Sequence, residues 1–274
     1  AMSIPEIADD YYQIDDAIRT GYAWSYGPFE IWDNLGIETG IEMIKSCGEE
    51  VPNWITDMSA SGAESFYKFE DGKKKFYDVN SKKYINVPSS ENHYILDAFR
   101  ENKQILRNPE CTVHDIGDGV MCIEFQTKGN SIGEGIAKGI NEAIDIAEKD
   151  GWNGIVIGNN DKQFSVGANL MNMGMMAMQK NFDEIEKFLV GFQKILMRMR
   201  TCNVPVVSAT HGFVMGGGLE VSIHCDAGIH ASESYIGLVE AGVGLIPGGG
   251  GTKEMAMRAS DSFNSGDVKM PSLI

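Results

Sequence analysis

The sequence predicts an α/β fold preceded by a mainly helical segment. Two observations support this prediction. Short apolar segments alternate with amphipathic helices over residues 109–274, whereas residues 1–108 show helical periodicity and a hairpin pattern without that alternation. Repeated strand–helix units indicate helices packed on a sheet. We place the boundary between residues 108 and 109, because a residue that precedes proline disfavours helix.

Helices are expected first in the N-terminal segment. Residues 7–20 carry Ile7, Tyr11, Ile14 and Ile18 at spacings of three and four, which is the pattern of an amphipathic helix. Two aromatic runs flank Asp71-Gly72, a typical hairpin signal. The expected elements are helices over 7–20, 29–35, 40–46 and 94–106 and a hairpin around residues 71–72.

Strands and helices alternate after Pro109. Two apolar runs flank Gly117-Asp118-Gly119, which predicts a second hairpin. The expected elements are hairpin strands over 112–116 and 120–126, further strands over 154–158, 204–209 and 227–231, and helices over 136–148 and 183–199.

Composition excludes several classes of protein. The chain has 274 residues with 23 basic and 39 acidic side chains, and both segments are acidic. Neither segment therefore offers the basic surface that nucleic acid or an anionic membrane requires. We expect no transmembrane segment and no signal peptide. Five scattered cysteines without a C-x-x-C pair suggest reduced thiols and a cytoplasmic location.

Two glycine-containing strings superficially resemble a dinucleotide-binding loop. Residues 133–139 and 242–248 both read G-x-G-x-x-x-G, but neither leads from a strand into a helix with an acidic residue about 20 positions later. A nicotinamide site is therefore not expected. His211 and His224 are expected to be structural, and no spacing indicates a metal site.

Three segments point to chemistry: residues 164–170, 211–220 and 236–251. The middle one follows a buried strand and opens a helix with Gly216-Gly217-Gly218. Glycines at a helix start leave backbone N–H groups free, and the helix dipole there favours developing negative charge. These are the requirements of an oxyanion hole.

These segments resemble the enoyl-CoA hydratase/isomerase (crotonase) superfamily, in the family's order and spacing. The resemblance implies a ββα spiral core. It also implies an oxyanion hole from the N–H groups of Ala168 and Gly217, with catalytic carboxylates at Glu220, which activates water, and Glu240, which donates the α-proton. Asn169 stands where the family often has aspartate, at a position without a catalytic role in the pattern.

The implied substrate is an acyl-CoA thioester. Gly167 and Gly216, which adjoin the two oxyanion donors, are expected to contact it. Met171 and Met173 follow directly and are expected either to line an adaptable acyl pocket or to pack in the core.

Each of these features also has a simpler interpretation. Glu220 taken singly could be a helix-capping residue, and Glu240 a surface carboxylate. The three glycines could form only a tight strand–helix turn. Their joint occurrence favours catalysis.

Residues 14–33 resemble the helical C-terminal domain of 3-hydroxyacyl-CoA dehydrogenases, with Gly27-Pro28-Phe29-Glu30 at the centre. The resemblance implies a fragment of a fused β-oxidation enzyme. Those dehydrogenases hold NAD in a preceding domain, so we expect no NAD cofactor and no dehydrogenase activity here. The crotonase domain normally continues well beyond the position of Ile274. We therefore expect it to be incomplete at its C-terminus, and any homo-oligomer to be altered.

The expected function is hydration of trans-2-enoyl-CoA to 3-hydroxyacyl-CoA in fatty-acid β-oxidation. Hydration needs a base and an acid, and the sequence offers both carboxylates, whereas superfamily isomerases commonly use one. Two alternatives stay open: an enoyl-CoA isomerase, or a catalytically silent fragment with an interaction or structural role.

Overall fold

The computed structural model describes residues 2, 4, 6–70, 72–88, 94–99 and 103–264. The chain forms two compact units, Ala1–Phe99 and Arg100–Ile274. The predicted boundary at 108/109 lies too late in the chain. Strand β4 (Gln104–Arg107) pairs antiparallel with β5 (Cys111–Asp115), so it belongs to the sheet of the second unit.

The first unit begins with helices, as predicted, although their ends differ by a few residues. Three of the four described helices were predicted, and the fourth, α4 (Asn53–Ala60), was not expected from the sequence. The helices are α1 (Tyr11–Tyr22), α2 (Pro28–Leu35), α3 (Ile37–Ser46) and α4 (Asn53–Ala60).

An antiparallel sheet completes the first unit, in the order β1-β2-β3. Its strands are β1 (Tyr67–Glu70), β2 (Lys73–Asp78) and β3 (Lys83–Asn86). The predicted hairpin is confirmed, with Asp71 outside the described residues. The helix predicted over 94–106 is wrong. Its described residues form a 3₁₀ turn, η1 (Leu96–Phe99), and strand β4, whose Ile105 and Leu106 pack against the core of the second unit.

A partly buried carboxylate joins the helices of the first unit to its sheet. Asp33 on α2 accepts the N–H groups of Phe66 at 2.6 Å and Tyr67 at 2.8 Å. Burial raises the pKa of Asp33 to about 6, and these two hydrogen bonds oppose the shift. The folded state therefore binds a proton at Asp33 more tightly than the unfolded chain does.

This shift predicts how the stability of the first unit depends on pH. Because the folded pKa exceeds the unfolded one, the stabilisation is complete below pH 4 and is lost as pH rises through about 6. We expect roughly 2 kcal/mol of this dependence to come from Asp33. Urea unfolding from pH 4 to 8, followed by tryptophan fluorescence, measures it. The same pH slope in Asp33→Asn would contradict the assignment.

A six-stranded sheet forms the centre of the second unit, in the order β10-β8-β7-β6-β5-β4. Its β4–β5 and β5–β6 pairs are antiparallel, and the other pairs are parallel. The hairpin predicted around residues 117–119 is confirmed as β5–β6, and the other three predicted strands are also present. The remaining strands are β6 (Val120–Phe125), β7 (Gly154–Ile157), β8 (Val206–Thr210) and β10 (Ala227–His230).

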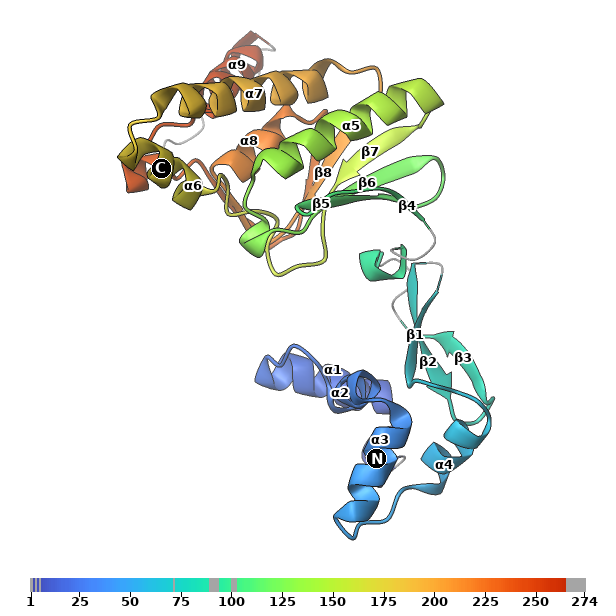
Figure 1. The fold of residues 1–274 in the computed structure, drawn as a ribbon. Coiled ribbons are helices and arrows are strands. Elements are labelled where there is room, and N and C mark those ends of the chain that lie inside the picture. The colour runs from blue at the N-terminus through green and yellow to red at the C-terminus, as the bar shows by residue number, and fades with distance from the viewer. Residues whose placement is uncertain are drawn as a thin grey trace. The chain divides into compact units, whose positions relative to one another are not determined.

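Helix α5 (Glu134–Asp150) packs on one face of this sheet, and α7 (Phe182–Thr201) packs against α5 (Figure 1). Both were predicted. The cross-strand partners Val113 of β5 and Ile123 of β6 are fully buried with Ile140 of α5 and Leu196 of α7. This apolar core fixes α7, which forms one wall of the site.

Short extended segments form a second layer. Strand β9 (Phe213–Met215) pairs parallel with β11 (Tyr235–Gly237). Isolated parallel bridges join Ser165 to Val214 and Ile132 to Ala168. Each segment follows a strand of the large sheet and leads toward a helix, so the chain advances in ββα turns. The predicted spiral core is confirmed.

Three further helices and two 3₁₀ turns surround this layer. They are α6 (Leu170–Met178), α8 (Gly217–His224), α9 (Gly251–Asn264), η2 (Lys128–Asn130) and η3 (Glu240–Val243). Within the described ranges, no helix is both long and apolar enough to span a membrane.

Candidate active site

The three glycine-containing segments meet at one cavity of about 450 Å³, which we call the α7–α8 cavity. Most of the site residues predicted from the sequence lie in its wall. The lining residues are Val166, Gly167, Ala168, Leu170, Met173, Ile185, Phe188, Leu189, Phe192, Gln193, Gly216, Gly217, Glu220, Val239, Glu240, Val243, Leu245, Ile246, Pro247, Gly248 and Gly249.

Two backbone N–H groups lie together in this wall. Gly217 is the first residue of α8, and a Cβ added to it would lie 3.3 Å from the nitrogen of Ala168. Neither N–H donates a hydrogen bond to another described residue. Gly167 has φ +92°, and a Cβ there would lie 2.7 Å from the carbonyl oxygen of Met215. Only glycine allows this approach, which brings the two donors together.

Glu220 lies one turn into α8 and is only 2% exposed. The N–H of Gly251, at the start of α9, donates to its Oε1 at 2.8 Å. Burial raises the pKa of Glu220, and the charge of Glu240 adds to the shift, while N–H groups of residues 249–251 oppose it. The result is a carboxylate whose proton affinity exceeds that of an exposed glutamate.

Glu240 begins the turn η3 and lies at the same end of the cavity as the start of α8. Its Oε2 is buried and has no hydrogen-bond partner among the described residues. A Cβ added to Gly216 would lie 3.0 Å from Glu240 Oε1, and Gly216 has φ +50°. The Gly216 N–H donates to Gly237 O at 2.8 Å, which ties the start of α8 to β11. Gly216 therefore brings Glu240 close to the helix start.

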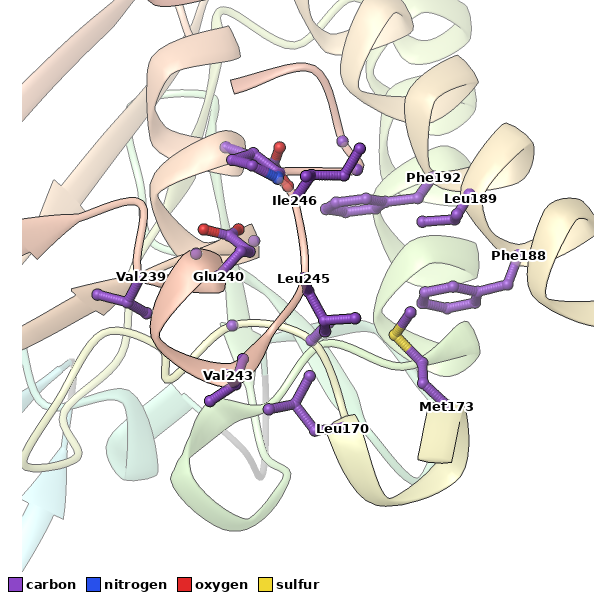
Figure 2. A pocket seen from close by; sticks show the side chains of 18 of the residues that line it. Leu170, Met173, Phe188, Leu189, Phe192, Val239, Glu240, Val243, Leu245 and Ile246 are labelled. Atoms are coloured by element: carbon purple, nitrogen blue, oxygen red, sulfur yellow. The ribbon is translucent and has the colours of Figure 1, made fainter. Parts of the chain in front are cut away.

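Apart from Gln193, the remaining side chains of the wall are apolar. In Figure 2, Glu240 lies among aliphatic and aromatic side chains contributed by α6, α7 and the segment after η3. Phe188 and Phe192 stack on each other along α7, with ring centroids 6.4 Å apart. The cavity thus combines two carboxylates and two N–H donors at one end with a surface suited to an apolar chain.

Comparison with known proteins agrees with this geometry. The sequence profile of the enoyl-CoA hydratase/isomerase family matches residues 115–265. The chain belongs to this family.

Two relatives are similar over almost the whole chain. A "Probable 3-hydroxyacyl-CoA dehydrogenase" of Bacillus subtilis is 39% identical over 270 residues, which cover 97% of this chain and 34% of the relative. A "Putative fatty acid oxidation complex trifunctional enzyme" of Rickettsia felis is 30% identical over 261 residues, or 94% and 33% of the two chains. The chain thus spans about a third of these relatives. Their names confirm the predicted resemblance to β-oxidation enzymes.

Solved hydratases share the fold. A Polaromonas enoyl-CoA hydratase is 23% identical with a TM-score of 0.52, covering 56% of this chain and 61% of its own. A Thermoplasma volcanium enoyl-CoA hydratase is 25% identical with a TM-score of 0.50, covering 57% and 63%.

One predicted substrate-binding residue of this family member is not in the cavity wall. Met171 is 76% exposed and does not line the cavity, whereas Met173 does. Leu170 and Met173 lie three residues apart on one face of α6, so the residue next to Leu170 points about 100° away. The assignment of Met171 is therefore corrected.

Sequence reasoning missed the residues of α7 and of the segment after η3 that line the α7–α8 cavity. The i, i+4 spacing of Phe188 and Phe192 predicts an apolar helix face, and α7 was predicted on such spacing. The same spacing is typical of core packing, so it did not distinguish a cavity wall from the core.

The two histidines that were expected to be structural contact backbone carbonyl oxygens. His224 is buried and its Nδ1 lies 2.7 Å from the Glu220 carbonyl oxygen. His211 contacts the carbonyl oxygen of Asp161 at 2.6 Å. Within the described part of the chain, no group of three or more His, Cys, Asp or Glu side chains could hold a metal ion.

Proposed function

We propose that the chain hydrates trans-2-enoyl-CoA to 3-hydroxyacyl-CoA, as a part of a fatty-acid β-oxidation enzyme. The observation that supports this most is the convergence of Glu220, Glu240 and two N–H donors on one otherwise apolar cavity. The family and its hydratase members support the same reaction class.

The N–H groups of Ala168 and Gly217 bind the thioester carbonyl oxygen in this proposal. Addition at C3 drives negative charge onto that oxygen, where the paired donors and the N-terminus of α8 stabilise it. Hydrogen bonds to an oxyanion are stronger than those to a neutral carbonyl, so the donors favour the transition state.

The two carboxylates divide the proton transfers. Glu220 accepts a proton from water while the water oxygen bonds to C3, and Glu240 donates a proton to C2. A raised pKa makes Glu220 a stronger base, provided that it is ionised. Hydration adds the elements of water and moves no electrons to a carrier, so the proposed reaction requires no redox cofactor.

The substrate partner in this proposal is an acyl-CoA thioester, whose acyl chain lies along the apolar wall. We further propose that the protein works in the cytoplasm, where its five unpaired cysteines stay reduced.

Offering trans-2-enoyl-CoA and trans-3-enoyl-CoA separately tests the proposal. Loss of the conjugated enoyl-thioester absorbance of crotonyl-CoA, with appearance of 3-hydroxybutyryl-CoA, is the expected result. Conversion of the 3-enoyl substrate without hydration would indicate an isomerase instead. Binding of both thioesters without turnover would indicate a catalytically silent fragment.

Two of the methionines of α6, Met171 and Met173, provide a matched pair for the acyl surface. We expect Met173→Ala to lower kcat/KM for crotonyl-CoA about tenfold, because a side chain of the cavity wall loses its contacts with substrate. We expect Met171→Ala to leave kcat/KM unchanged, because that side chain points away. Equal effects of the two variants would refute the placement.

A further inference from the structure

A cluster of charged side chains around one buried carboxylate lies behind Glu220, outside the cavity wall. At its centre is Glu254 on α9, whose side chain is fully buried. Its carboxylate forms ion pairs with Arg200 of α7 and with Lys253 Nζ at 2.9 Å, and its Oε1 lies 3.5 Å from His224 Nε2. One carboxylate thus links α7, α8 and α9.

Two short connections lead from this cluster to the catalytic end of the cavity. Glu254 lies three residues after Gly251, and its own N–H donates to Gly250 O at 3.0 Å. The Gly251 N–H in turn donates to Glu220 Oε1. On α8, the Nδ1 of His224 donates to the Glu220 carbonyl oxygen at 2.7 Å, since a carbonyl can only accept.

We propose that Glu254 and Arg200 are positioning residues that hold the start of α9 so that the Gly251 N–H stays on the Glu220 carboxylate. This rests on the proposed role of Glu220 as the base. A buried carboxylate without its partners is strongly destabilising, so the Arg200–Glu254 ion pair favours one position of the helix end. Surface ion pairs contribute far less. The Glu254 carboxylate is fully buried, whereas the carboxylates of Asp145 and Glu148, which pair with Arg198 on α7, are 60% and 30% exposed.

The hydrogen bond from Gly251 favours the ionised form of Glu220 and opposes the effect of burial. The other charged or titratable groups facing this region are Glu240 on η3, His224 on α8 and Lys253 on α9. If the start of α9 moves away, the ionised base loses its donor while Glu240 stays close. The pKa of the base then rises further, and less of it is ionised at neutral pH.

Arg198 supplies a matched control on the same helix. It pairs with Asp145 at 2.5 Å and Glu148 at 3.6 Å on α5, and its exposure is similar to that of Arg200. Arg198→Gln therefore removes an interhelical ion pair of α7 without touching α9.

Amide hydrogen exchange at Gly251 tests the positioning without any assay of activity. We expect exchange to speed up about tenfold or more in Glu254→Gln and Arg200→Gln, with little change in Arg198→Gln, and recovery in Arg200→Lys. Unchanged Gly251 exchange in both folded variants would overturn the proposal. Because this readout requires no turnover, it remains decisive even if the chain proves not to be a hydratase.

The pH profile of kcat/KM for crotonyl-CoA supplies the second readout. We expect the acid limb to move to higher pH in Glu254→Gln and Arg200→Gln, with activity regained at alkaline pH. Arg198→Gln should keep the wild-type profile. A uniform loss of activity at every pH, with an unmoved acid limb, would mean that the cluster serves stability alone and would overturn the positioning role.

Discussion

Replacing Glu240 by glutamine is expected to lower kcat for enoyl-CoA hydration by about 10²- to 10⁴-fold. Glutamine keeps the size of the side chain but has no acidic proton for C2. The apolar wall and the two N–H donors remain, so KM should change little. Steady-state hydration of crotonyl-CoA measures both constants.

Glu220→Gln should cause a loss of the same order, because the buried amide cannot accept a proton from water. The two carboxylates act in one reaction, so the double variant should lose little more than either single variant. Glu184→Gln, which alters an exposed pair with Lys187 on α7, is the control and should retain full activity. Wild-type rates in either cavity variant would contradict the assigned roles.

Replacing Gly217 by proline is expected to lower kcat by about 10²- to 10³-fold, the cost of one oxyanion donor. Gly217 is the first residue of α8, where proline is tolerated because the N–H has no partner within the helix. The substitution therefore removes the donor with little change in the helix.

Gly217→Ala is the matched control for this experiment. It adds a Cβ at the same place, 3.3 Å from the Ala168 nitrogen, but keeps the N–H. The ratio of the two kcat values isolates the hydrogen bond from the added bulk. A ratio near one, with both variants folded, would show that the N–H of Gly217 does not stabilise the transition state.

The catalytic end of the cavity could be predicted because its signals are local in the chain. A glycine triplet that ends a strand and starts a helix dictates free N–H groups there, and Glu220 follows within one turn. Glu240 could be placed beside Glu220 only through the family resemblance. The two residues belong to different ββα turns of the chain, and no periodic pattern in the sequence relates one turn to the other.

The second layer could not be predicted from periodicity. Strands β9 and β11 have three residues each, and the other segments pair through single bridges. Segments of this length are too short to show the alternation of apolar and polar residues that predicts a strand. The failure at 94–106 has a related cause. Ile105 and Leu106 fit a helical pattern, but pairing with β5 and burial against the second core decide their conformation.

Hydration in ¹⁸O-labelled water tests the central claim most directly. If Glu220 activates water for addition at C3, each 3-hydroxybutyryl-CoA formed from crotonyl-CoA will carry one solvent oxygen in its hydroxyl group, as seen by mass spectrometry. The Glu220→Gln and Glu240→Gln variants will form almost none at equal protein concentration. Bound crotonyl-CoA that gains no solvent oxygen in the wild-type chain would contradict the account.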